Sequence, residues 1–126
     1  AYGDQAKAQA VTENILQANS DLAAIWCSND LMTYGALQAV KSAKKINQIK
    51  IVGFDGYEMV LEMIKSGEIK GDVAQNPAEM GKQTAIAANA LIKGETVPAV
   101  IDTGMVLITP ETAAQFAKDR YNKELK

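Results

Sequence analysis

Histidine is absent from this sequence, and cysteine occurs only once, as Cys27. The lack of histidine excludes imidazole bases, serine–histidine–carboxylate triads and metal sites that are built on histidine ligands. A single cysteine forms neither an internal disulfide nor a thiolate zinc site, so packing alone must hold the fold together. We therefore expect a protein that is not an enzyme and that carries no metal or other cofactor.

An excess of positive charge is also missing, because 13 Lys+Arg stand against 15 Asp+Glu and leave a net charge of −2. Proteins that bind a phosphate backbone carry a basic surface, so we expect no nucleic-acid partner. No apolar run approaches the roughly 20 residues that cross a bilayer, and the first residues do not resemble a signal peptide. The chain starts with Ala1 instead of methionine, and we expect a processed chain or a fragment.

The 126 residues, 48% of them hydrophobic, contain short apolar runs that alternate with helical patterns. This alternation, with a dozen or more residues between successive apolar runs, predicts an α/β fold with a parallel sheet flanked by helices. We see no linker and no interior domain boundary. The patterns predict strands at 22–27, 49–53 and 69–75, an extended segment at 98–108, and helices at 4–19, 31–44, 57–66, 77–93 and 110–122.

The first apolar run, 22–27, is nearly continuous and uncharged after Asp21. Such a run is typical of a strand that is buried on both faces of a parallel sheet. We therefore expect Trp26 to pack in the core instead of stacking on a ligand, and Cys27 to be a small buried apolar residue.

Polar side chains follow the three predicted strands. Asn29, Asp55 and Gln75 stand near the carboxyl ends of the strands, where open α/β sheets bind their ligands. Two amides and a carboxylate suit a polyhydroxylated ligand, and Phe54 and Tyr57 are aromatic candidates for stacking on a sugar ring. The alternative is structural: Asn29 or Asp30 caps the next helix, Asp55 and Gly56 form a tight turn, and Gln75 satisfies a loop backbone.

Four blocks of this sequence, 24–40, 51–56, 73–81 and 104–109, resemble the C-terminal part of periplasmic sugar-binding proteins of the ribose-binding type. That family delivers sugars to ABC importers. The resemblance implies that residues 1–126 are most of the C-terminal lobe of a two-lobed protein whose cleft binds a small sugar. It also implies a periplasmic location, a membrane permease as partner, and ligand contacts from the positions of Asn29, Asp55 and Gln75.

The chain departs from this family in extent. The whole N-terminal lobe and the first two strands of the C-terminal lobe would precede Ala1, and an expected sugar-binding arginine has no counterpart here. In the family the helix at 77–93 packs on the other lobe, and the first missing strand pairs with 22–27. We therefore expect 22–27 to be an exposed edge, covered by the rest of the protein or by self-association.

Two other classes of protein are weighed against this hypothesis. The effector-binding domain of a lactose-repressor-type regulator shares the fold and the Asn-Asp and Gly-Phe-Asp turns, so it remains the alternative function. An enzyme of the doubly wound type would need a nucleophile with a positioned base, and the sequence offers no such pair.

Overall fold

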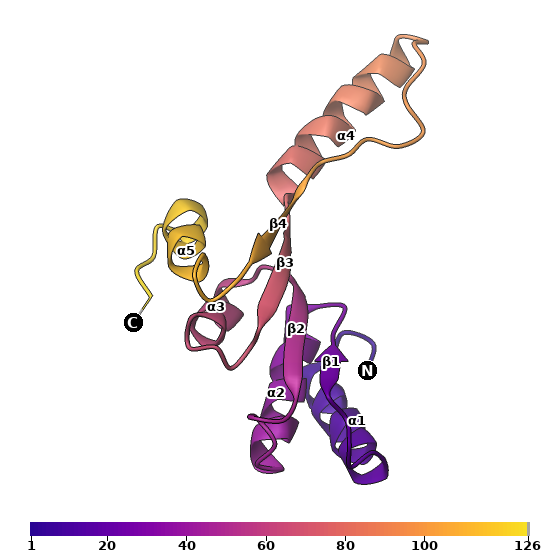
Figure 1. Ribbon diagram of the computed structural model, residues 1–126. Helices are drawn as coiled ribbons and strands as arrows, with labels where there is room; N and C mark the ends of the chain where they lie inside the picture. Colours follow the sequence, from indigo (N-terminus) through magenta and orange to yellow (C-terminus); the bar gives the residue numbers. More distant parts are fainter. Residues whose placement is uncertain (126) are drawn as a thin grey trace. The chain divides into compact units, whose positions relative to one another are not determined.

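Nine helices and strands alternate along residues 1–125, the part of the chain that the computed structural model describes (Figure 1). This alternation is the predicted α/β pattern. The helices are α1 (Gln5–Ala18), α2 (Asp30–Ser42), α3 (Glu58–Lys65), α4 (Pro77–Ile92) and α5 (Ala113–Tyr121). The strands are β1 (Ala24–Trp26), β2 (Lys50–Asp55), β3 (Gly71–Gln75) and β4 (Met105–Ile108).

The strands form one sheet in the order β1-β2-β3-β4. β1 pairs with β2 in parallel, with Ile25 opposite Ile51, and β2 pairs with β3 in parallel, with Val52 opposite Gly71. Helices α2 and α3 are the connections that such parallel pairs require. The prediction of a parallel sheet flanked by helices is confirmed.

The described chain divides into two units: residues 1–74 together with those from 107 onward form the first, and residues 75–106 form the second. The core lies in the first unit, where aliphatic side chains from α2, β2 and α3 are fully buried. α1 packs on α2 at Gly35, where an added Cβ would collide with the Gln5 carbonyl oxygen. α3 packs on α5. The largest buried side chains are Leu37, Ile49, Ile51, Leu61, Ile64, Ile69 and Ile108.

Helices α1 and α4 start at residues whose side chains cap them. Asp4 accepts a hydrogen bond from the Lys7 amide at 2.7 Å, and Asn76 accepts one from the Glu79 amide at 3.4 Å. Pro77 occupies the first turn of α4, where its missing N–H costs nothing. Side-chain oxygens at these positions satisfy amides that the helix leaves without a partner.

Strand β1 corrects two predictions. It is three residues long, its first and last residues are exposed, and Trp26 is 66% exposed, so the strand is not buried on both faces and Trp26 is not in the core. β1 lies at the edge of the sheet, as expected. Among the described residues it has a hydrogen-bonded neighbouring strand, β2, along one edge only. Cys27 is buried, as predicted.

The C-terminal predictions are correct only in part. Residues 98–108 were predicted to be extended; they contain no helix, and Met105–Ile108 forms a strand within them. The predicted helix 110–122 is shorter at both ends, α5 being Ala113–Tyr121.

No helix within residues 1–125 is both long enough and apolar enough to cross a membrane.

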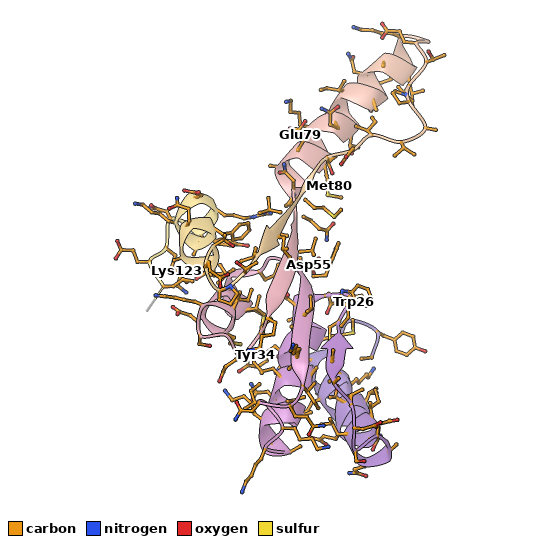
Figure 2. All side chains as sticks on the ribbon, viewed as in Figure 1. Trp26, Tyr34, Asp55, Glu79, Met80 and Lys123 are labelled. Carbon is orange, nitrogen blue, oxygen red and sulfur yellow. The ribbon has the colours of Figure 1, made fainter. Side chains whose placement is uncertain are left out.

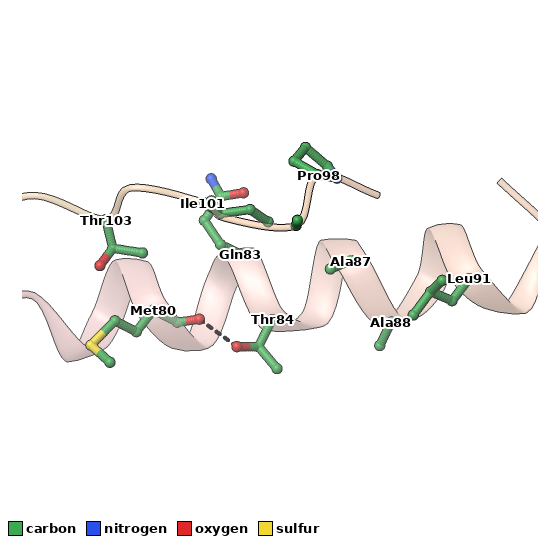
Figure 3. A pocket seen from close by; sticks show the side chains of 10 residues that line it. Met80, Gln83, Thr84, Ala87, Ala88, Leu91, Pro98, Ile101 and Thr103 are labelled. Carbon is green, nitrogen blue, oxygen red and sulfur yellow. Dashed lines mark hydrogen bonds between the residues drawn. The ribbon is translucent and has the colours of Figure 1, made fainter. Parts of the chain in front are cut away.

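The second unit consists of α4, the segment after it and the start of β4. None of the α4 residues is buried. A groove of about 510 Å³ lies between α4 and residues 98–103, and Met80, Leu91 and Ile101 are among the apolar side chains that line it (Figure 3). Thr84 turns its hydroxyl back to the Met80 carbonyl, at 2.8 Å, which leaves the methyl group for the surface.

Candidate ligand-binding site

Asn29 begins helix α2 just beyond the end of β1. Its Oδ1 accepts a hydrogen bond from the Met32 amide at 2.9 Å, so the capping role that competed with ligand binding is real. Its backbone carbonyl accepts from the Thr33 hydroxyl at 2.8 Å. Within the described residues its Nδ2 donates no hydrogen bond. One side chain can therefore cap the helix through its oxygen and still donate to a ligand through its nitrogen.

Asp55 is the last residue of β2 and is half-buried (Figure 2). Its φ of 129° and that of Gly56, 78°, lie in the region that favours glycine. Two features of position 56 require glycine: its positive φ, and the close approach of Ala74, whose Cβ would stand 2.5 Å from an added Cβ. A non-glycine residue in this conformation costs about 1–3 kcal/mol and persists only where its surroundings hold it, which is most common at functional sites.

Gln75 is the last residue of β3 and is half-buried. The residue before it, Ala74, pairs with Asp55 in the sheet. Asn29 and Asp55 thus stand at the carboxyl ends of two hydrogen-bonded parallel strands, and both belong to the first unit. Gln75 is the first residue of the second unit. Of the two aromatic candidates, Tyr57 is 49% exposed and Phe54 is half-buried.

Two carboxyl groups near this edge are buried, which the sequence analysis did not predict, since it considered Asp30 only as a helix cap. Asp30, the first residue of α2, and Asp72, in β3, are both 0% exposed. Asp30 Oδ2 accepts a hydrogen bond from the Tyr57 amide at 2.6 Å. The available clue was an acidic residue inside an apolar strand, since a buried carboxylate requires a partner.

The environment raises the pKa of both carboxyl groups. Burial is the largest cause for each, because it penalises the charged form. For Asp30, the hydrogen bond with Asp72 and the charges of Asp72 and Asp55 add to the effect, the Tyr57 amide opposes it, and the pKa reaches about 8. For Asp72 the charge of Asp55 also raises the pKa, while hydrogen bonding to Asp30 and the Gly56 backbone lowers it.

The chemistry available here is hydrogen bonding. Among residues 1–125 no three acidic or cysteine side chains are grouped so that they could hold a metal ion. The Cys27 thiol has a pKa raised above 9.0, chiefly by burial, so it is not an activated nucleophile. The candidate functional groups, which are half-buried, are amide and carboxylate, and these can hold a neutral polar ligand.

Comparison with known proteins agrees with this geometry. A family model described as a periplasmic binding protein domain matches residues 1–96. The chain belongs to the periplasmic binding protein family. Among curated members, it is 40% identical over 106 residues to the ribose import binding protein RbsB of Haemophilus influenzae, and 38% identical over 96 residues to the D-allose-binding periplasmic protein of Escherichia coli.

These alignments cover 84% and 75% of this chain but only 36% and 31% of the two relatives. A solved solute-binding protein of an ABC transporter from Agrobacterium vitis, with bound α-D-tagatopyranose, matches with a TM-score of 0.83 and 32% identity. That match covers 94% of this chain and 40% of the solved one. This periplasmic-binding-protein chain therefore spans about a third of the length of its curated relatives.

Proposed function

We propose that this chain is the ligand-contacting part of the sugar-binding component of an ABC importer, and that Asn29, Asp55 and Gln75 hydrogen-bond the sugar. It would act outside the cytoplasm, deliver its ligand to a membrane permease, and bind without catalysis. Relatives named for ribose and allose support this function. The observation that carries it is the placement of Asn29 and Asp55 at the carboxyl ends of β1 and β2, with the amide nitrogen of Asn29 left for a ligand.

The chain would provide one wall of a binding cleft, residues 1–126 being part of a C-terminal lobe and the helix at 77–93 contacting an N-terminal lobe. The exposed apolar side chains of α4, including Ile86, Leu91 and Ile92, support such a contact. The alternative of a transcription regulator's effector domain is not favoured, because the relatives are transport proteins.

Simple energetics explain why a second wall is needed. A hydrogen bond to the charged Asp55 contributes about 1.5–3 kcal/mol, and one to a neutral amide contributes about 1 kcal/mol. Micromolar affinity requires about 8 kcal/mol. The summed hydrogen-bond contributions of Asn29, Asp55 and Gln75 fall short of this value. The remaining contacts would therefore come from the N-terminal lobe.

Replacing Asp55 with asparagine tests the proposal. In a protein that joins this chain to an N-terminal lobe, Asp55→Asn keeps the side-chain shape but removes the charged acceptor, so affinity should fall roughly ten- to a hundredfold. Titration calorimetry with ribose, allose, tagatose and arabinose measures it. Asp21→Asn, the same change at an exposed position, is the control and should bind normally.

Two results would contradict the proposal. If Asp55→Asn and Gln75→Ala each bind the best sugar as tightly as the unmodified protein, these residues are turn and loop residues only. If no sugar in the panel binds the unmodified protein, the ligand is of another class.

A further inference from the structure

The buried carboxyl groups of Asp30 and Asp72 meet above Gly53, in the middle of β2. A Cβ placed on Gly53 would collide with Asp72 Oδ2, and it would stand 2.9 Å from Asp30 Oδ1 and 2.8 Å from Thr33 Oγ1. Oxygens from α2 and β3 thus converge on one small space over β2. The glycine at position 53 provides that space.

These oxygens are short of hydrogen-bond donors. Asp30 Oδ1 and both oxygens of Asp72 lack a hydrogen bond of good geometry, and the Gly56 backbone N–H is the donor that approaches Asp72. Neither residue forms an ion pair within residues 1–125. Two ionised carboxylates side by side in a buried site repel each other and lack the solvation that water would give. One proton between them converts one oxygen into a donor and removes one of the two charges.

The pair is attached to the turn that carries Asp55. Asp30 Oδ2 accepts from the Tyr57 amide at 2.6 Å, and the Tyr121 hydroxyl donates to the Gly56 carbonyl at 2.7 Å. Both bonds are made by one peptide group, the one that joins Gly56 to Tyr57, so that group is held from α2 and from α5. Asp55, with its φ of 129°, is the residue whose backbone needs such support.

We propose that Asp30 and Asp72 hold a single proton between them and that this protonated pair positions the 55–57 turn for ligand binding. The inference rests on the proposed function for its effect on sugar affinity. Asp30 and Asp72 are positioning residues, since they act through Asp55 and do not touch the ligand. Loss of the shared proton would place two like charges together, push α2 and β3 apart at this point and shift the Tyr57 amide.

Three other titratable side chains face the pair. Cys27 follows β1, Asp55 ends β2, and Tyr121 lies on α5. Burial raises the pKa of the Cys27 thiol above 9.0 and that of Tyr121 above 10.0, so both stay uncharged in neutral solution. Between pH 6 and 9 the pair itself is therefore the group in this cluster that loses a proton.

The first test is the pH dependence of sugar affinity in a protein that joins this chain to an N-terminal lobe. The unmodified protein should lose roughly fivefold or more in affinity between pH 6 and pH 9 as the proton leaves. Asp72→Asn supplies an amide N–H in place of the shared proton, so its affinity should stay near the value of the unmodified protein at pH 6 and vary much less with pH. The control, Asp21→Asn, should keep the profile of the unmodified protein.

The second test needs no sugar. In carboxyl and amide NMR spectra of the unmodified protein, the side-chain carbons of Asp30 and Asp72 and the backbone amide of Tyr57 should titrate with one midpoint above pH 6. In Asp72→Asn the Tyr57 amide should no longer follow that titration.

The outcomes are separable. Spectra with both carboxyl groups ionised at pH 6, or a sugar affinity that does not change with pH, would overturn the inference. If no sugar binds at any pH, the proposed function fails, and the NMR titration still decides whether the pair shares a proton and is coupled to the turn.

Discussion

Single residues at this edge of the sheet serve the fold and the proposed site together. Asn29 caps α2 with its oxygen and leaves its nitrogen for a ligand. Asp55 ends a strand in a conformation that its neighbours must maintain. The positions of Asn29, Asp55 and Gln75 at the carboxyl ends of strands were predictable from their place in the chain, and their contact with a ligand stays a prediction. The Asp30–Asp72 pair was not predictable, because the sequence does not show that α2 and β3 bring two carboxyl groups over Gly53.

The buried pair predicts how stability depends on pH. An unfolded aspartate releases its proton near 3.8, whereas the folded pair holds one to about pH 8. Its stabilising contribution is therefore fully present below about pH 3.8 and is lost as the pH rises to about 8. In that window the native state binds more protons than the unfolded state, so the free energy of unfolding should fall by up to about 1.4 kcal/mol per pH unit.

Urea denaturation at pH 5, 6.5 and 8 measures this slope. Asp72→Asn should reduce this slope, because it removes the charge and the hydrogen bond of Asp72 while Asp30 stays buried. Asp21→Asn, at an exposed position, should leave the slope unchanged. Equal slopes in the unmodified protein and in Asp72→Asn would mean that the pair does not hold the proton.

Helices and strands were predictable to different degrees. Capping residues and a proline in the first turn locate helix starts from the sequence, because the orphan amides of a helix are satisfied by nearby side chains. Strand burial depends on what lies across the sheet, which a run of apolar residues does not specify. Trp26 shows the difference: β1 is a strand in the predicted place, yet its tryptophan is 66% exposed at the sheet edge.

The N-terminus of α2 allows capping and ligand binding to be separated by mutation. Asn29→Ala removes the acceptor for the Met32 amide and should lower the free energy of unfolding by about 0.5–2 kcal/mol. Asn29→Ser restores a capping oxygen but has no amide group for a sugar. Urea denaturation should find Asn29→Ser close to the unmodified protein in stability, and calorimetry should find both variants weakened in sugar binding.

The comparison with alanine decides which function the side chain has. If Asn29→Ser binds sugar normally while Asn29→Ala is destabilised, Asn29 is a cap and not a ligand residue.

At the scale of the whole molecule, the two units leave different surfaces without a covering partner in the described chain. In the first unit the edge of the sheet is β1, a strand without charge or proline whose last residue, Trp26, is exposed. A groove lined by Ile15, Ile25 and Met32, among others, lies along this edge. In the second unit, α4 has no buried residue. Exposed edges and apolar patches of this kind favour association with another chain.

We therefore expect the 126-residue chain to self-associate when it is purified alone and to bind sugar weakly. Light scattering over a range of concentrations should show species larger than a monomer. An added N-terminal lobe should convert these species into a complex of one such chain with one N-terminal lobe. Trp26→Lys should reduce self-association, because a charge on an edge strand disfavours pairing with another edge. Met59→Lys adds the same charge on α3, where Met59 is 36% exposed, and should leave association unchanged. A monomer of these residues that binds sugar without any other chain would show that β1 and α4 need no covering partner.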